Sequence, residues 1–232
     1  MEALTRRSII RGLPRLALLA LAWCTLTGGV FSGCRGLFTP AIPEPPTGRP
    51  IVPDYRSPEA TLRTMALGIQ AKGQGASAWL GAFADSTRPE DGPAYHQFFD
   101  PADLEFDQGT CGCEAPTDWR TSQEQEFYLE FLSVRPSDEY AAIFDSVETR
   151  PDPTAGDTEA VLHRRYLVLA TALDGNSTQV IAVGFADLTF TKVAAGRWLI
   201  TRWEDHVDPD VGVNPSDPEQ LTLGRRRLES TR

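Results

Sequence analysis

The chain has 232 residues, of which 41% are hydrophobic and 9% aromatic, a composition typical of folded globular proteins and unlike that of disordered ones. Its formal net charge is −10 at pH 7, and no basic stripe along the sequence offsets it. Because such a chain repels phosphate backbones, the charge excludes nucleic acid as an expected partner.

Residues 1–33 have the pattern of a secretory signal. Four arginines give the segment a basic start, and Leu16–Trp23 is its apolar core. This core is shorter than the roughly 20 apolar residues that a membrane-spanning helix needs. We therefore expect export from the cytoplasm.

The end of this segment, Phe31-Ser32-Gly33-Cys34, resembles a bacterial lipobox, with Phe31 where leucine is usual. The resemblance implies that the Cys34 thiol is acylated and becomes the mature N-terminus, which makes the lipid bilayer a partner. The several acyl chains of a lipoprotein give the stable attachment that one chain does not. An ordinary cleaved signal with a chance cysteine and an uncleaved anchor are the alternatives.

Two further features bear on localisation in the bacterial cell envelope. Thr5–Arg11 (TRRSIIR) resembles a twin-arginine export motif, so both this route and the general secretory route stay open. Arg35, rather than an aspartate, follows the cysteine. In a bacterium with two membranes, this favours the outer membrane.

Residues 34–56 are predicted to form a tether. The stretch has few residues able to build a core and contains six prolines: Pro40, Pro43, Pro45, Pro46, Pro50 and Pro53. Proline at this density favours extended polyproline II, which spans about 3.1 Å per residue. The tether would hold the following domain away from the membrane.

A domain is predicted over residues 57–206, and it begins with two helices. Ser57 suits the cap position, Pro58 suits the first helical position, and apolar residues recur at spacings of three and four. This first helix should stop at Lys72-Gly73. A short second helix is expected over residues 76–84.

The next stretch is predicted to be less regular. Residues 95–106 should cross the domain irregularly around a turn at Asp100-Pro101, and residues 107–118 should form a polar loop. Thr121 has capping-box spacing to Glu124 and should open a third helix that ends before residue 136.

The polar loop carries Cys111 and Cys113. Two free thiols or a strained disulfide between them is one interpretation, and a metal or redox role is the other. Because no further pair of ligands with zinc-like spacing lies nearby, we expect no metal and no cofactor.

The rest of the domain is predicted to be antiparallel sheet. Strands are expected over residues 139–149, 161–173, 178–191 and 197–205, with a hairpin turn at Asp174-Gly175-Asn176. Residues 207–232 form an acidic, proline-containing linker and a short basic tail. The tail contains a helix-forming stretch over residues 218–230 that either packs on the domain or remains loose.

This order of elements resembles the cone-shaped superfamily of nuclear transport factor 2, scytalone dehydratase, ketosteroid isomerase and the SnoaL-like polyketide cyclases. Three short patterns carry the resemblance: residues 57–60 (SPEA), 95–107 (YHQFFDPADLEFD) and 196–205 (GRWLITRWED). The resemblance implies an α+β fold with three N-terminal helices on a strongly curved, mostly antiparallel sheet. The superfamily includes enzymes, binding modules and assembly domains, so it does not decide the function.

Isomerase and dehydratase members of that superfamily use an acid or a histidine in the cone pocket, and no motif here matches theirs. Asp187 is a candidate because it lies mid-strand among apolar neighbours, where burial would raise its pKa. Alternation along the last strand predicts one face with Trp198, Ile200, Arg202, Glu204 and His206. This polar row is the second catalytic candidate, and a solvated face with cross-strand pairs is the alternative.

We predict a lipid-anchored, non-catalytic envelope protein that binds a protein partner or a small apolar ligand. The candidates for lining its pocket are aromatic: Tyr95, Phe99, Trp119, Phe185 and Trp203. An isomerase- or dehydratase-like enzyme with a pocket carboxylate and an envelope assembly module are the alternatives. The enzyme requires a buried Asp187 facing a cavity, whereas the binding module predicts an exposed Asp187 or one paired with a basic residue of a neighbouring strand.

Overall fold

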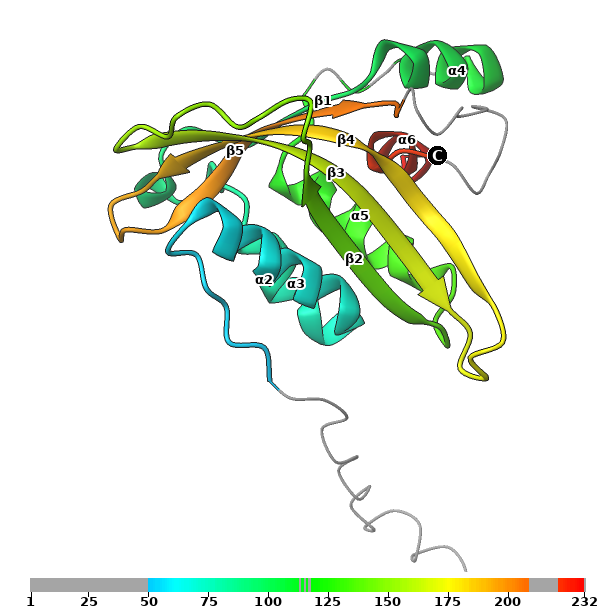
Figure 1. Cartoon of the computed structure of the whole chain (residues 1–232). Coiled ribbons are helices and arrows are strands. Elements are labelled where there is room, and N and C mark those ends of the chain that lie inside the picture. Colours follow the sequence, from blue (N-terminus) through cyan, green and yellow to red (C-terminus); the bar gives the residue numbers. More distant parts are fainter. Residues whose placement is uncertain (1–49, 113, 115, 117, 209–220, 232) are drawn as a thin grey trace, which may run out of the picture. The chain divides into compact units, whose positions relative to one another are not determined.

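The computed structural model describes residues 50–112, 114, 116, 118–208 and 221–231 (Figure 1). The predicted signal, Cys34, residues 34–49 of the tether and Cys113 lie outside the described residues. Gly48–Arg232 form one compact unit. No helix in the described ranges has both the length and the apolar character needed to cross a membrane.

The unit is built on a five-stranded sheet in the order β1-β5-β4-β3-β2. The strands are β1 (His96–Phe98), β2 (Glu139–Ser146), β3 (Glu159–Thr171), β4 (Thr178–Lys192) and β5 (Trp198–His206). β1 runs parallel to β5, and the other neighbours are antiparallel. Figure 1 shows β3 and β4 as long, bent strands that make the sheet strongly curved.

In the described residues, five α-helices accompany the sheet: α2 (Pro58–Gln70), α3 (Ala76–Leu80), α4 (Pro101–Cys111), α5 (Thr121–Ser133) and α6 (Leu223–Glu229). In Figure 1, α2 and α3 lie side by side, and α6 lies next to β4. The fold class is therefore α+β with a curved, mostly antiparallel sheet, as predicted.

The first helix follows the sequence prediction closely. The Ser57 hydroxyl accepts a hydrogen bond from the Ala60 amide at 3.2 Å, and Pro58 occupies the first turn, where its missing N–H costs nothing. After α2, the chain turns back so tightly that a Cβ atom on Gly75 would overlap the Gly68 backbone. The Tyr128 hydroxyl lies 2.8 Å from the Gly68 carbonyl oxygen and fixes this turn to α5.

The prediction for residues 95–118 was wrong over residues 101–111, which form the helix α4. The Asp100 carboxylate accepts a hydrogen bond from the Ala102 amide at 2.8 Å, and Pro101 is the first residue of α4. Asp-Pro therefore starts a helix here, because these two residue types suit a helix N-terminus as well as a turn. The polar loop starts only after Cys111, the last residue of α4, which is disulfide-bonded.

Two smaller differences concern element ends. The N-cap of α5 is Arg120 and not Thr121, since the Arg120 amide donates to the Gln123 side chain at 3.0 Å. The end of the predicted tether packs on the domain. The Tyr55 carbonyl oxygen accepts from the Trp198 amide at 2.6 Å, and the Tyr55 hydroxyl donates to the Ala78 carbonyl oxygen at 3.2 Å.

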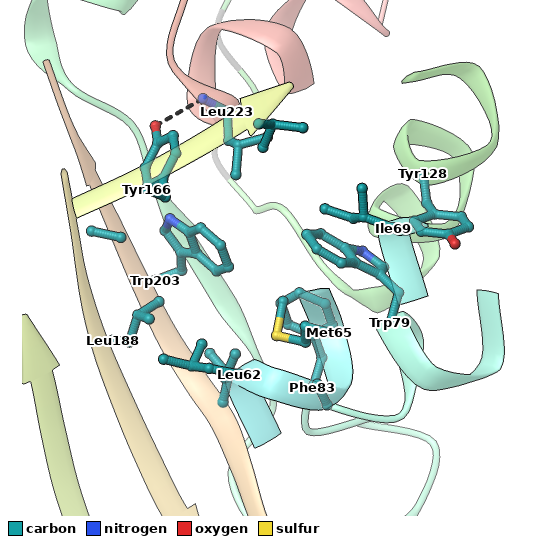
Figure 2. Close-up of a cluster of buried hydrophobic side chains, with 14 of the residues drawn as sticks. Leu62, Met65, Ile69, Trp79, Phe83, Tyr128, Tyr166, Leu188, Trp203 and Leu223 are labelled. Carbon is teal, nitrogen blue, oxygen red and sulfur yellow. Dashed lines mark hydrogen bonds between the residues drawn. The ribbon is translucent and has the colours of Figure 1, made fainter. Parts of the chain in front are cut away.

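The core is aromatic (Figure 2). Trp203 has its ring centroid 6.5 Å from that of Trp79 and 6.4 Å from that of Phe83. Trp198 and Trp203 are 8% and 0% exposed, so both tryptophans of β5 are buried.

The alternation predicted for β5 was wrong in its first half. The pairing of β5 with β4 shifts between Thr189 and Phe190, so that Phe190 lies opposite Ile200 and Thr189 lies opposite Arg202. Thr201 is the extra residue of this bulge. Ile200 therefore faces the core with Trp203, while Arg202 points to the opposite face of the sheet.

Candidate functional site

The C-terminal helix α6 packs into the domain, which decides between the two alternatives for the tail. The Thr222 hydroxyl caps the helix by accepting from the Arg225 amide at 2.8 Å. Thr222 also donates to the Asp103 carboxylate, and this bond joins α6 to α4. The side chains of Arg225 and Arg227 are buried.

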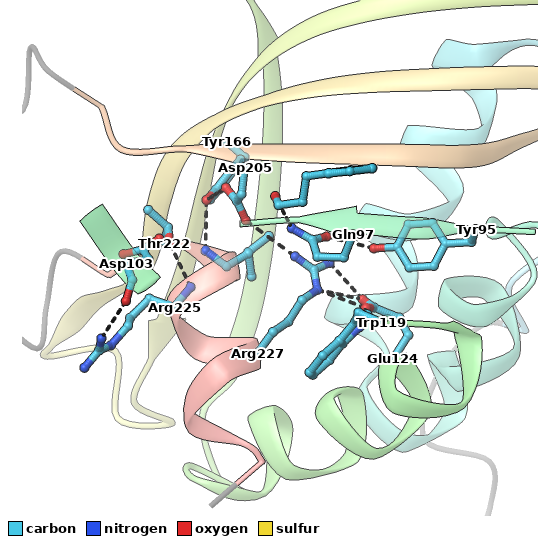
Figure 3. Close-up of polar contacts among 12 residues, drawn as sticks. Tyr95, Gln97, Asp103, Trp119, Glu124, Tyr166, Asp205, Thr222, Arg225 and Arg227 are labelled. Carbon is cyan, nitrogen blue, oxygen red and sulfur yellow. Dashed lines mark hydrogen bonds and ion pairs between the residues drawn. The ribbon is translucent and has the colours of Figure 1, made fainter. Parts of the chain in front are cut away.

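Arg227 reaches the interior and meets charges from distant parts of the chain (Figure 3). Its guanidinium donates to Glu124 of α5 at 2.8 and 2.9 Å, and the Trp119 indole donates to the same carboxylate at 2.8 Å. It also lies 4.5 Å from the ring centroid of Trp203 and 3.5 Å from the Asp205 carboxylate. One buried cation is thus held between two acids and an aromatic face.

Asp205 is the most strongly perturbed acid of this interior. Its side chain is 1% exposed, and burial raises its pKa to about 7, although the charge of Arg227 and the hydrogen bond from Tyr166 act in the opposite direction. The Tyr166 hydroxyl donates to Asp205 and accepts from the Leu223 amide at 2.8 Å. The start of α6 therefore covers Asp205 (Figure 3).

The five aromatic pocket candidates do not line a common cleft in the described structure. Tyr95, Trp119 and Trp203 are 0–1% exposed and belong to the packed core. Phe99 is partly buried, with its ring centroid 5.8 Å from that of Trp119. Phe185 lies opposite Arg165 on the face of the sheet away from the core.

Asp187 lies on that outer face and is surrounded by basic groups. Its carboxylate is 2.6 Å from His163 Nδ1, 2.7 Å from Arg150 Nη2 and 3.3 Å from His206 Nε2. Burial acts to raise the pKa of Asp187, but contacts with both histidines and the charge of Arg150 outweigh it and lower the pKa to about 2. The same contact with Asp187 raises the pKa of His206.

The predicted polar row of β5 lies beside Asp187. Glu204 is directly opposite Asp187, and its carboxylate is 2.5 Å from the Arg202 side chain. The structure thus brings Asp187, Glu204 and His206 together on the outer face. His163 and Arg150 belong to the same cluster and were not predicted.

A cleft of about 310 Å³ opens between the end of α5, the start of β4 and α6. Its apolar wall consists of Phe131, Val134, Val180 and Ile181, and Tyr140 of β2 completes it. Its charged rim consists of Glu130, Arg135, Arg226 and Glu229. Arg226 is held in place by donating to the Ile181 carbonyl oxygen at 3.0 Å.

No protein-family model matches the sequence, and no curated protein sequence matches it. Several solved structures are similar to the chain. A protein of unknown function from Mycobacterium tuberculosis has a TM-score of 0.48 and 14% identity, covering 74% of this chain and 85% of that one. ActVI-ORFA from Streptomyces coelicolor has a TM-score of 0.44 and 12% identity, covering 63% of this chain and 94% of that one.

A proposed scytalone dehydratase from Novosphingobium aromaticivorans is also similar. It has a TM-score of 0.41 and 12% identity, covering 65% of this chain and 80% of that one. Similarity to solved structures at such low sequence identity does not indicate the activity of this chain.

Proposed function

We propose that this chain is a lipid-anchored protein of the bacterial cell envelope whose domain binds a small apolar ligand or a protein partner without catalysing a reaction. The observation that carries this proposal is the position of Arg227. The interior of the curved sheet, where a substrate would meet a catalytic carboxylate, holds this side chain and its two acidic partners.

Neither Asp205 nor Asp187 is suited to act as a general base. Asp205 has the raised pKa that such a role requires, but it is 1% exposed and covered by α6. Asp187 is paired with His163 of the neighbouring strand and with Arg150, and its pKa of about 2 makes it a weak base at neutral pH. Such pairing is the arrangement that the binding-module interpretation predicts.

The cleft beside α6 is the proposed ligand site. Its volume of about 310 Å³ lies at the small end of the range for ligand pockets, about 300–1,000 Å³. Its apolar wall with a few charged groups at the rim is the usual composition of such pockets. The ligand is therefore expected to be small, with an apolar body and a polar end.

Binding can be tested with the compact unit Gly48–Arg232 and the neutral fluorescent probe N-phenyl-1-naphthylamine. Val134→Arg should abolish the fluorescence increase, because Val134 lines the cleft. Leu129→Arg is the matched control, since Leu129 is an exposed apolar residue of α5, which Val134 directly follows, and does not line the cleft. Equal probe binding by both variants would reject the cleft as the ligand site.

The anchor is tested separately, in cells. We propose that the acylated Cys34 holds the domain outside the cytoplasm, at the outer membrane where the source has two membranes. Cys34→Ala should leave the protein unprocessed or release it from the membrane fraction. Membrane-bound and normally processed Cys34→Ala protein would contradict the lipoprotein assignment.

A further inference from the structure

We propose that Asp187, Glu204 and His206 form a binding site for a divalent transition-metal ion such as zinc on the outer face of the sheet. One potential ligand atom from each side chain lies within 4.8 Å of the other two. Carboxylate oxygen and imidazole nitrogen are both zinc ligands, and three protein ligands leave a fourth position open to water. This site is separate from the cleft and from the interior around Arg227.

The sheet itself positions the three side chains. Asp187 of β4 is directly opposite Glu204 of β5, and His206 follows two residues later on the same face. Side chains at directly opposite and diagonal positions of antiparallel strands lie close enough to interact. The ligands therefore come from two paired strands and not from a loop, which limits the cost of ordering them.

The three side chains need to move only a little to bring their ligand atoms to the distances found around a metal ion. Ligand atoms around a tetrahedral zinc ion with bonds of about 2.0 Å lie about 3.3 Å apart, so no pair of these atoms needs to close by more than about 1.5 Å. Asp187 Oδ2 and His206 Nε2 are already 3.3 Å apart. His206 Nε2 is shielded from solvent and lacks a well-aligned hydrogen bond, so an ion between the two groups would supply its partner.

The surrounding residues fit a supporting role. His163 Nδ1 lies 2.6 Å from Asp187 Oδ1, which fixes the carboxylate and leaves its Oδ2 for the ion, as outer residues of metal sites commonly do. Arg150 now contacts Oδ2 at 2.7 Å. Its side chain is 54% exposed, so it can move into solvent when an ion arrives. Arg150 and the ion therefore compete for the same oxygen.

A zinc titration can distinguish a metal site from a cluster of surface ion pairs, because a bound ion would compete with Arg150 for Asp187 Oδ2. The untagged full chain, solubilised in detergent, would be titrated with zinc chloride near neutral pH by isothermal titration calorimetry. We expect one zinc ion whose affinity falls at least about tenfold in His206→Ala and in Glu204→Gln. Arg150→Ala should raise the affinity, because it removes the competing cation.

His96→Ala is the matched control, since His96 is another partly exposed histidine, 3.5 Å from the Asp118 carboxylate. It should leave the affinity unchanged. Thermal melting of each variant shows whether the fold persists. If His206→Ala does not fold, the zinc affinity of Glu204→Gln is the deciding measurement. The proposal is overturned if the wild-type chain binds no zinc up to about 0.1 mM. It is also overturned if His206→Ala binds zinc as the wild type does, or if Arg150→Ala binds it more weakly.

Discussion

The guanidinium of Arg227 and the carboxylate of Glu124 form a two-point ion pair in which neither side chain is exposed to solvent. Removing one partner of such a pair leaves a buried charge without compensation. Arg227→Met should therefore lower the free energy of unfolding by about 3–5 kcal/mol, measured by urea denaturation. Arg56→Met is the control, because Arg56 pairs with Asp54 at the surface and its loss should have no measurable effect. Equal stability of both variants would contradict the buried pair.

The second prediction concerns the aromatic core. Trp203 is 0% exposed and packs against Trp79 and Phe83, so Trp203→Ala should cost about 3–5 kcal/mol of unfolding free energy. Leu173→Ala, at a side chain that is 72% exposed, should cost far less. Losses below about 1 kcal/mol at both Trp198 and Trp203 would mean that β5 is placed wrongly.

The third prediction uses two glycines of one turn. A methyl group on Gly75 would overlap the backbone of Gly68, whereas one on Gly73 would meet nothing within 4 Å. Gly75→Ala should lower the free energy of unfolding by about 1–3 kcal/mol or more, because backbone atoms must move apart. Gly73→Ala should be close to neutral. The difference between their melting temperatures is the measurement, and equal values would reject the close approach.

The fourth prediction concerns pH. Burial raises the pKa of Asp103 from 3.8 to about 6, although the hydrogen bond from Thr222 acts in the opposite direction. Between these values the folded protein keeps a proton that the unfolded chain has released, so this group makes stability fall as the pH rises from about 4 to 6. Asp103→Asn removes the titration and should flatten this fall in melting temperature. The exposed Asp145→Asn is the control, and an identical pH profile for Asp103→Asn and wild type would refute the assignment.

Much of the fold was predictable because its signals are local. Ser57-Pro58 starts α2, and the turn at Gly175 separates β3 from β4. Counting outward from the hairpin pair Thr171–Thr178 would place Ala186 opposite His163. The observed pairing of His163 with Asp187 arises because Ile181 is an extra residue in β4, so it could not be found by counting. The sequence of α4 was ambiguous because Asp100-Pro101 suits both a turn and a helix start.

The interior site could not be predicted in the same way. Three consecutive arginines at 225–227 are the usual pattern of a solvated helix, and no local feature shows that Arg227 meets acids at positions 124 and 205. Periodicity also cannot reveal an added residue within a strand. The face assigned to Ile200 was wrong for that reason.

The bulge at Thr201 makes β5 unequally sensitive to changes in length. Ile200 and Trp203 both face inward because Thr201 is an extra residue between the pair Ile200–Phe190 and the pair Arg202–Thr189. Deleting Thr201 would make Ile200 and Arg202 adjacent, as Phe190 and Thr189 are, so the ladder would become regular and the later side chains would keep their faces. Inserting a residue after Arg202 would instead turn Trp203 outward and bury the charged row. In natural homologues, loss of the bulge residue should therefore be tolerated more readily than an insertion in the second half of β5.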